Sequence, residues 1–185
     1  MSKFKIHDLE SAPEESKPIL EASIKGFGML PNLHGVMAES PTVLKAYKLL
    51  HQFFSKETAF DAEELTVIWQ TINVENNCHY CVPAHTGIAH MMKVNPEITE
   101  ALRNRAPMPT AKLQALHETT LLIVRNQGQL TAEEMDTFFA AGYGTRHVLE
   151  IFLGLAQKTI SNYTNHVAKT PVDAPFTKFA WETSV

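Results

Sequence analysis

The hydrophobic residues of this chain recur at helical spacing over most of its length. For example, the apolar residues Leu65, Ile68, Trp69 and Ile72 fall on one face of a helix. The same spacing predicts helices over 14–26 and 96–104. Further helices are expected to begin at or beside Ser40, Asp61, Thr110, Thr131 and Thr145. Runs of roughly four to eight alternating β-branched residues, which would indicate strands, are not found. The pattern therefore predicts an all-α fold.

Capping residues mark the starts of two of these helices. Asp61 is followed three residues later by Glu64, and Thr131 is followed at the same spacing by Glu134. This spacing is that of a capping box, in which two side chains satisfy free backbone N–H groups reciprocally. The helix expected from Thr145 is the longest, and its apolar residues include Val148, Leu149, Phe152, Leu155 and Tyr163.

The length of the chain suits one compact domain. It has 185 residues, of which 44% are hydrophobic. We expect a helical domain over residues 1–170, followed by an irregular tail over 171–185 that lacks helical periodicity. The aromatic residues Phe176, Phe179 and Trp181 of this tail are candidates for packing onto the domain or onto a neighbouring subunit.

Charge and hydropathy exclude several classes of protein. The net charge is −4, with acids and bases interspersed, so no basic stripe indicates a nucleic-acid partner. The N-terminal residues are polar and lack the apolar core of a signal peptide. No apolar run reaches the roughly 18 residues that a membrane span needs. We therefore expect a soluble, cytoplasmic protein that binds neither nucleic acid nor membrane.

Candidate chemistry lies in the pair Cys78 and Cys81, the two cysteines of the chain. Together with His85 they share one face of a helix. Pro83 fits best in the first turn of a helix, so the helix begins near Tyr80 or Cys81, or begins earlier and is kinked. In either case the cysteines lie at or just before a helix N-terminus, where the dipole favours a thiolate.

Three interpretations of this pair remain open: a redox couple, part of a metal site, or inert packing. A close pair in a reducing cytosol is more often catalytic or metal-binding than a structural disulfide. Zinc normally takes four ligands, whereas Cys78, Cys81 and His85 supply three. We therefore favour the redox couple, with no metal.

The stretch around these cysteines is similar to a known family. The sequence NNCHYCVPAHTGIA, after a capped amphipathic helix, resembles the core motif of the carboxymuconolactone decarboxylase / AhpD-like alkyl hydroperoxidase superfamily. The likeness is strongest over residues 58–92, and GFGMLPNL upstream and NYTNH downstream resemble its longer, peroxidase-related branch. The resemblance implies a domain of about seven to eight helices that forms homo-oligomers. It also implies thiol-dependent reduction of hydroperoxides by an external dithiol, without a bound cofactor.

The resemblance assigns a role to each residue of the motif. Cys81 would attack the peroxide, Cys78 would resolve the product as a disulfide, and His85 would belong to a proton relay. The family's usual glutamate on the preceding helix aligns with Thr66, and threonine is not a base at neutral pH. Glu75, three residues before Cys78, is the candidate to take its place.

Three further residues are candidates for the substrate pocket: His79 and Tyr80, which separate the cysteines, and Trp69 on the preceding helix. Two other functions use the same residues. One is a binding protein that holds a metal or senses oxidants through the cysteines. The other is an enzyme like carboxymuconolactone decarboxylase that relies on His85.

Overall fold

The structure is a computed structural model that describes residues 3–182. Between these residues the chain is helical and contains no strand, which confirms the all-α prediction. The elements are η1 (Glu14–Ser16), α1 (Lys17–Phe27), α2 (Asn32–Met37), α3 (Pro41–Glu57), α4 (Ala62–Glu75), α5 (Cys81–Met91), α6 (Pro96–Arg103), α7 (Ala111–Arg125), α8 (Ala132–Ala140), α9 (Thr145–Ala168) and η2 (Ala174–Phe179). No helix of the described chain has the length and apolar character needed to cross a bilayer.

Local capping chemistry sets where the helices begin, as the sequence indicates. Asp61 accepts a hydrogen bond from the N–H of Glu64, whose side chain accepts one from the N–H of Asp61. Thr131 and Glu134 form the second capping box in the same way. Each box satisfies N–H groups that have no partner within the helix.

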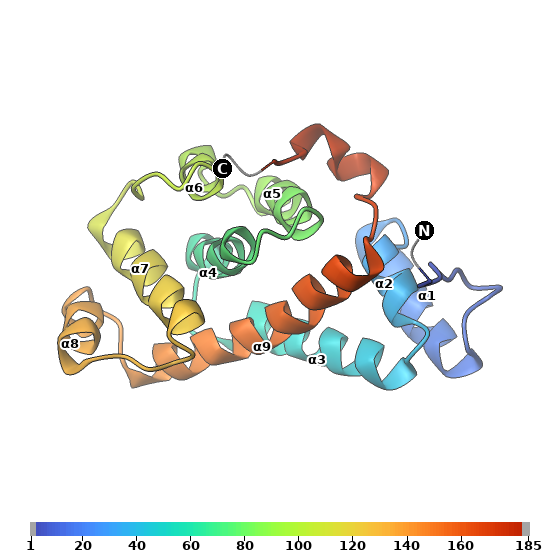
Figure 1. The fold of residues 1–185 in the computed structure, drawn as a ribbon, viewed down its shortest axis with the longest axis horizontal. Coiled ribbons are helices and arrows are strands. Elements are labelled where there is room, and N and C mark those ends of the chain that lie inside the picture. The colour runs from blue at the N-terminus through green and yellow to red at the C-terminus, as the bar shows by residue number, and fades with distance from the viewer. Residues whose placement is uncertain (1–2, 183–185) are drawn as a thin grey trace.

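Helix α4 lies at the centre of the fold and packs against α5, α6, α7 and α9 (Figure 1). Its residues from Glu64 to Val74 are all buried. The long helix α9 runs beside α3 on one side of this centre. A helix enclosed by neighbours on every side holds its side chains in fixed positions, so α4 is a rigid base for the residues that follow it.

The buried apolar residues form two clusters. The larger cluster surrounds α4 and includes Phe54, Trp69 and Phe138. The smaller cluster contains both cysteines, packed with residues of the N-terminal helices such as Leu20 and Leu33. The cysteine pair therefore lies where the N-terminal helices meet the start of α5.

Two elements differ from the expected pattern. Helix α2 was not expected, because a six-residue helix is too short to show a period. The tail was expected to be irregular, but its residues Ala174–Phe179 form η2, a 3-10 helix that packs on α5. Gly87 permits this approach, since a Cβ there would lie 2.4 Å from Phe176. Both α2 and η2 are stabilised by contacts with residues far away in the sequence, and local periodicity does not predict such contacts.

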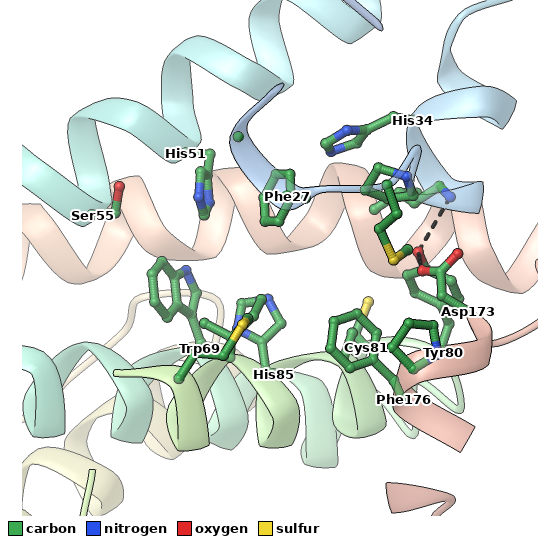
Figure 2. Close-up of a pocket in the computed structure, with 18 of the residues that line it drawn as sticks. Phe27, His34, His51, Ser55, Trp69, Tyr80, Cys81, His85, Asp173 and Phe176 are labelled. Atoms are coloured by element: carbon green, nitrogen blue, oxygen red, sulfur yellow. Dashed lines mark hydrogen bonds between the residues drawn. The ribbon is translucent and has the colours of Figure 1, made fainter. Parts of the chain in front are cut away.

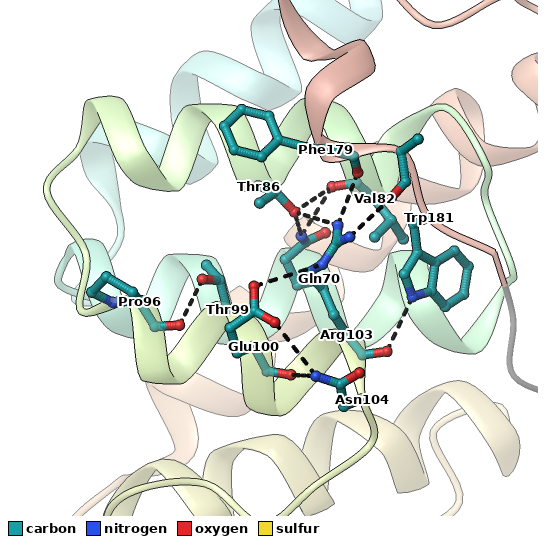
Figure 3. Close-up of polar contacts among 11 residues, drawn as sticks. Gln70, Val82, Thr86, Pro96, Thr99, Glu100, Arg103, Asn104, Phe179 and Trp181 are labelled. Carbon is teal, nitrogen blue, oxygen red and sulfur yellow. Dashed lines mark hydrogen bonds and ion pairs between the residues drawn. The ribbon is translucent and has the colours of Figure 1, made fainter.

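Hydrogen bonds with α6 hold residues 179–181 of the tail (Figure 3). The Arg103 guanidinium donates to the carbonyls of Phe179 and Ala180, each at 3.0 Å, and to Thr86 Oγ1 on α5. In return, the indole N–H of Trp181 donates to the carbonyl of Arg103 at 3.0 Å. The tail is thus fixed to α5 and α6 by polar contacts as well as by aromatic packing.

Candidate functional site

The connection between α4 and α5 places the two cysteines. Asn77 adopts a left-handed conformation with φ of 52°, which asparagine tolerates better than most residues. The chain then turns, and the N–H of Cys78 donates to the carbonyl of Asn73 at 2.9 Å. Helix α5 begins at Cys81, so Pro83 lies in its first turn, where its missing N–H has no cost. Of the two helix starts left open by the sequence, the one near Cys81 is therefore found.

The two thiols are free and buried, and they are close to each other. The N–H of Cys81 donates to Sγ of Cys78 at 3.3 Å. The side-chain amide of Asn165, on α9, donates to Sγ of Cys81 at 3.2 Å. A thiol that receives a hydrogen bond at a helix N-terminus is in an environment that favours its thiolate form.

The environments of the two cysteines shift their pKa values in opposite directions. Burial raises the pKa of Cys81, but a hydrogen bond from Cys78, the charge of Lys158 and the amide of Asn165 outweigh burial and lower it to about 6. The pKa of Cys78 is raised, first by its hydrogen bond to Cys81 and then by burial. At neutral pH this arrangement holds Cys81 as the thiolate and Cys78 as the thiol.

Lys158 and His85 form a contact in the interior next to this pair. Nζ of Lys158 on α9 lies 2.9 Å from Nε2 of His85 on α5. Burial, followed by the charge of Lys158, lowers the pKa of His85 well below its usual value. His85 is therefore neutral at physiological pH, and its Nε2 accepts a hydrogen bond from the ammonium group.

A cavity of about 620 Å³ opens beside Cys81. It lies between α5, the connection from α1 to α2, α3 and η2, and Lys158 and Asp173 contribute polar groups to its wall. Figure 2 shows Trp69, His85 and Cys81 on one side of this space, with His51 and His34 across from them. Its volume is within the range of small-molecule sites, so the cavity can hold a ligand larger than hydrogen peroxide beside the thiol.

Aromatic rings form a continuous wall along this cavity. Ring centroids lie 5.7 Å apart for His34 and Tyr47, 6.4 Å for Tyr47 and His51, 5.6 Å for His51 and Trp69, and 4.9 Å for Trp69 and His85. Burial lowers the pKa of His34 to about 3 and that of His51 to about 4, so both rings are neutral. The wall therefore offers flat, uncharged surfaces suited to an apolar or aromatic ligand.

The structure brings four of the predicted site residues to the cavity: Trp69, Tyr80, Cys81 and His85. The hydroxyl of Tyr80 donates to Asp173 Oδ2 at 2.5 Å and accepts from the N–H of Leu33 at 3.3 Å. Tyr80 therefore joins the site to both the tail and α2.

Two other predicted residues lie elsewhere. His79 is exposed, and its Nε2 lies 3.0 Å from the carbonyl oxygen of Thr170. Glu75 is held by Arg125 at 2.7 Å and by Arg105 at 3.2 Å. The hydrogen bond from Arg125 is the largest of the effects that lower the pKa of Glu75. Within residues 3–182, neither His79 nor Glu75 is among the residues that line the cavity.

The sequence analysis missed several residues of the site, among them Lys158, His51 and Asp173. Lys158 carries a recognisable signal, since it occupies the same face of α9 as the buried Ile151, Gly154 and Asn165. A lysine at a buried helical position is unusual and points to a function. His51 and Asp173 carry no such signal, because only the packing of α3 and the tail against α5 brings them to the cavity.

The described chain, residues 3–182, has no group of three or more His, Cys, Asp or Glu side chains placed to hold a metal ion. Cys78, Cys81 and His85, the ligands considered from the sequence, therefore do not form such a group.

Comparison with known proteins gives structural likenesses only. No protein-family model and no curated protein matches the sequence. A peroxidase-related protein from Ralstonia eutropha JMP134, described as an alkylhydroperoxidase AhpD core, superposes with a TM-score of 0.83 at 18% identity, over 95% of this chain and 94% of the other. A peroxidase-related protein from Silicibacter sp. TM1040 gives 0.79 at 18% identity, over 95% of each chain.

A third solved structure is the debrominase Bmp8, as a cysteine-to-alanine variant in complex with 2,3,4-tribromopyrrole. It superposes with a TM-score of 0.78 at 18% identity, over 94% of this chain and 93% of the other. These likenesses show that the chain has the AhpD-like fold, as its cysteine motif predicts.

Proposed function

We propose that this chain is a thiol-dependent oxidoreductase that reduces hydroperoxides, with Cys81 as the attacking thiol and Cys78 as the resolving thiol. The placement of the two free thiols carries the proposal. Cys81 lines the cavity, and Sγ of Cys78 lies 3.3 Å from the Cys81 backbone nitrogen. The lowered pKa of Cys81 supplies the thiolate that this chemistry needs.

In the first step the Cys81 thiolate attacks the terminal oxygen of the hydroperoxide. An S–O bond forms, the O–O bond breaks, and its electron pair leaves with the alkoxide. Cys81 becomes a sulfenic acid, and the alkoxide takes up a proton to become an alcohol. The amide of Asn165 and the charge of Lys158 stabilise the thiolate before this attack.

In the second step Cys78 attacks the sulfenic acid of Cys81. The disulfide forms, and the hydroxide that leaves takes the thiol proton of Cys78 and departs as water. An external dithiol then restores both thiols by exchange, and is itself oxidised to a disulfide. No cofactor takes part in this proposed cycle.

The two peroxidase-related proteins of the same fold support this choice of substrate, although they share only 18% of their residues with this chain. The physical support is independent of them. A thiol with a pKa of about 6 is largely the nucleophilic thiolate at neutral pH, and the second thiol, three residues away in the chain, is placed to resolve the oxidised form.

The direct test is consumption of tert-butyl hydroperoxide with dithiothreitol as reductant. Wild type is compared with Cys81→Ser and Cys78→Ser, and thiols are titrated after one equivalent of peroxide. We expect turnover in wild type alone, with loss of both thiols per chain. A wild type that consumes no peroxide and keeps both thiols would contradict the proposal. Activity on a lactone that survives loss of both thiols but requires His85 would favour an acid–base enzyme instead.

Reductive dehalogenation of an aromatic compound is a second candidate for the same thiol pair. The observation that favours it is the aromatic wall of the cavity, together with the likeness to a debrominase. The Cys81 thiolate would take the halogen as a sulfenyl halide, and the ring carbon would keep the electron pair and gain a proton from solvent. Cys78 would then displace the halide and form the disulfide. Release of bromide from a bromopyrrole in the presence of dithiothreitol separates this reaction from peroxide reduction.

A further inference from the structure

Lys158 carries its ammonium group into the protein interior, where the residue is 1% exposed. It lines the same cavity as Cys81, and its Nζ lies 2.9 Å from Nε2 of His85. The carboxylates that form ion pairs within residues 3–182 are paired with other basic residues. Because a charge is costly to bury without a partner, the ammonium group needs a counter-ion within the site.

The titratable groups that face Lys158 identify this counter-ion. Cys81 and His85 face it from α5, Cys78 from the connection before α5, and His51 from α3. Burial holds both histidines neutral, so neither is an anion. Burial also lowers the pKa of Lys158, whereas the charges of the two cysteines raise it. A cysteine thiolate therefore favours the charged form of Lys158.

We propose that Lys158 is a catalytic general acid that gives its proton to the leaving oxygen of the substrate. This inference rests on the proposed reduction of hydroperoxides. An ammonium group has three N–H donors. One is directed at Nε2 of His85, which fixes the position of Nζ. In the proposed reaction the other two serve the Cys81 thiolate and the leaving oxygen.

The proton balance of the oxidation then closes within the site. At the start Cys81 is a thiolate, Cys78 is a thiol and Lys158 is protonated. The thiolate attacks, the O–O bond breaks, and the alkoxide takes its proton from Lys158 to leave as an alcohol. Cys78 then forms the disulfide, and its own thiol proton leaves in water. The products are the disulfide, the alcohol, water and a neutral Lys158, so no proton is exchanged with the solvent.

The neutral lysine is the form that the oxidised site stabilises. When Cys78 and Cys81 are joined, neither can be a thiolate, so only the effect of burial on the pKa of Lys158 remains. The dithiol that reduces the disulfide carries two protons. One returns to Cys78 and the other to Lys158, which restores the starting state with Cys81 as the thiolate. Lys158 thus holds or releases its proton according to the redox state of the cysteines.

Leaving-group dependence is the first test, because a general acid matters most when the leaving group is a strong base. Single-turnover thiol loss is measured with tert-butyl hydroperoxide, which releases an alkoxide, and with peracetic acid, which releases a carboxylate. Each rate is divided by the fraction of Cys81 present as thiolate, which is obtained from absorbance at 240 nm. A change in the pKa of Cys81 then does not affect the comparison of rates. Lys158→Met removes both charge and proton, whereas Lys158→Arg keeps the charge but holds its proton too tightly to give it up.

We expect both variants to react with tert-butyl hydroperoxide about 100-fold more slowly than wild type, and to change little with peracetic acid. Lys45→Met, which removes an exposed lysine of α3, is the matched control and is expected to behave as wild type. Variants that slow both peroxides equally would overturn the proposal and leave Lys158 with an electrostatic role alone. A wild type that reacts with neither peroxide would instead refute the proposed function.

Proton balance in wild type is the second test and needs no variant. Reduced protein, at a pH where absorbance at 240 nm shows one thiolate per chain, is mixed with one equivalent of tert-butyl hydroperoxide in weak buffer containing a pH indicator. If Lys158 supplies the proton, we expect no net uptake. Uptake of one proton per disulfide formed would show that Lys158 is charged in the oxidised site, and would overturn the closed proton balance proposed for it.

Discussion

The hydroxyl of Tyr80 donates a hydrogen bond to the carboxylate of Asp173 at 2.5 Å, so the segment between the two cysteines is tied to the C-terminal tail. The other oxygen of Asp173 accepts from the N–H of Asn32, the first residue of α2, at 2.9 Å. One carboxylate therefore links α2, the tail and the start of α5. Residues of all three segments line the cavity, so this carboxylate helps to hold the cavity wall together.

Removal of the Tyr80 hydroxyl is expected to weaken this junction. Tyr80→Phe leaves the ring in place but deprives the Asp173 carboxylate of a donor in a buried position. Hydrogen bonds to charged groups contribute about 1.5–3 kcal/mol, and we expect a loss of that order in the free energy of unfolding, measured with urea. Tyr163→Phe, on the exposed face of α9, is the control and is expected to change stability little. Equal losses in the two variants would contradict the prediction.

Gly87 on α5 is expected not to tolerate a side chain. A Cβ there would lie 2.4 Å and 2.6 Å from two ring atoms of Phe176, which lines the cavity from the tail. We expect Gly87→Ala to destabilise the protein by about 1–3 kcal/mol, as overpacking does, or to displace the tail. Limited proteolysis followed by mass spectrometry detects displacement as faster cleavage near the C-terminus.

Gly26 in α1 provides the comparison for Gly87. A Cβ at this position would have no atom within 4 Å. Since alanine is favoured over glycine in a helix, Gly26→Ala is expected to stabilise the protein slightly or leave its stability unchanged. If both alanine variants were destabilised alike, the close approach of Phe176 would not be the cause.

The sequence predicts those parts of the fold that depend on local chemistry. Capping boxes at Asp61 and Thr131 are found as expected, because they involve residues only three apart. The motif also predicts that the cysteines lie at or just before a helix N-terminus, and α5 does begin at Cys81. The aromatic residues of the tail indicate that it packs onto the domain or a neighbouring subunit. Its partners, such as Arg103 for Phe179, lie far away in the sequence, and no local pattern identifies them.

Helix α9 shows why the candidate site was only partly predicted. Its most apolar positions include Leu149 and Tyr163, yet these residues are 66% and 58% exposed. The buried face instead carries polar groups such as Lys158 and Asn165, which serve the cysteines. A periodicity argument assigns the apolar face to the core and so misses the face that forms the site.

The role expected for Glu75 also depends on distant residues. Its carboxylate forms ion pairs with Arg105 and Arg125, which lie far from it in the sequence. The expected homo-oligomer stays a prediction.

The amide of Asn165 is expected to stabilise the Cys81 thiolate directly, since it donates to Sγ at 3.2 Å. Hydrogen bonds to charged groups contribute about 1.5–3 kcal/mol. One pKa unit corresponds to about 1.4 kcal/mol. We therefore expect Asn165→Ala to raise the pKa of Cys81 by about one to two units, measured from thiolate absorbance at 240 nm.

His166 lies on the same turn of α9 as Asn165 but faces solvent. His166→Ala is therefore the matched control, and we expect it to leave the pKa of Cys81 unchanged. An unchanged pKa in the Asn165 variant would show that the amide positions α9 without stabilising the thiolate.

The reactivity of Cys81 is expected to depend on pH with a midpoint at about 6, its lowered pKa. The thiolate is the nucleophile, so the rate of alkylation by iodoacetamide should level off about one pH unit above this midpoint and fall about tenfold for each pH unit below it. An unperturbed cysteine has a pKa of about 8.5 and would still be gaining reactivity at pH 8. Because the pKa of Cys78 is raised, this second thiol stays protonated over the same range, and mass spectrometry should find one label per chain, on Cys81. A midpoint near 8.5, or equal labelling of both cysteines at pH 7, would show that the site does not separate their pKa values. The assignment of attacking and resolving thiols would then lose its electrostatic basis.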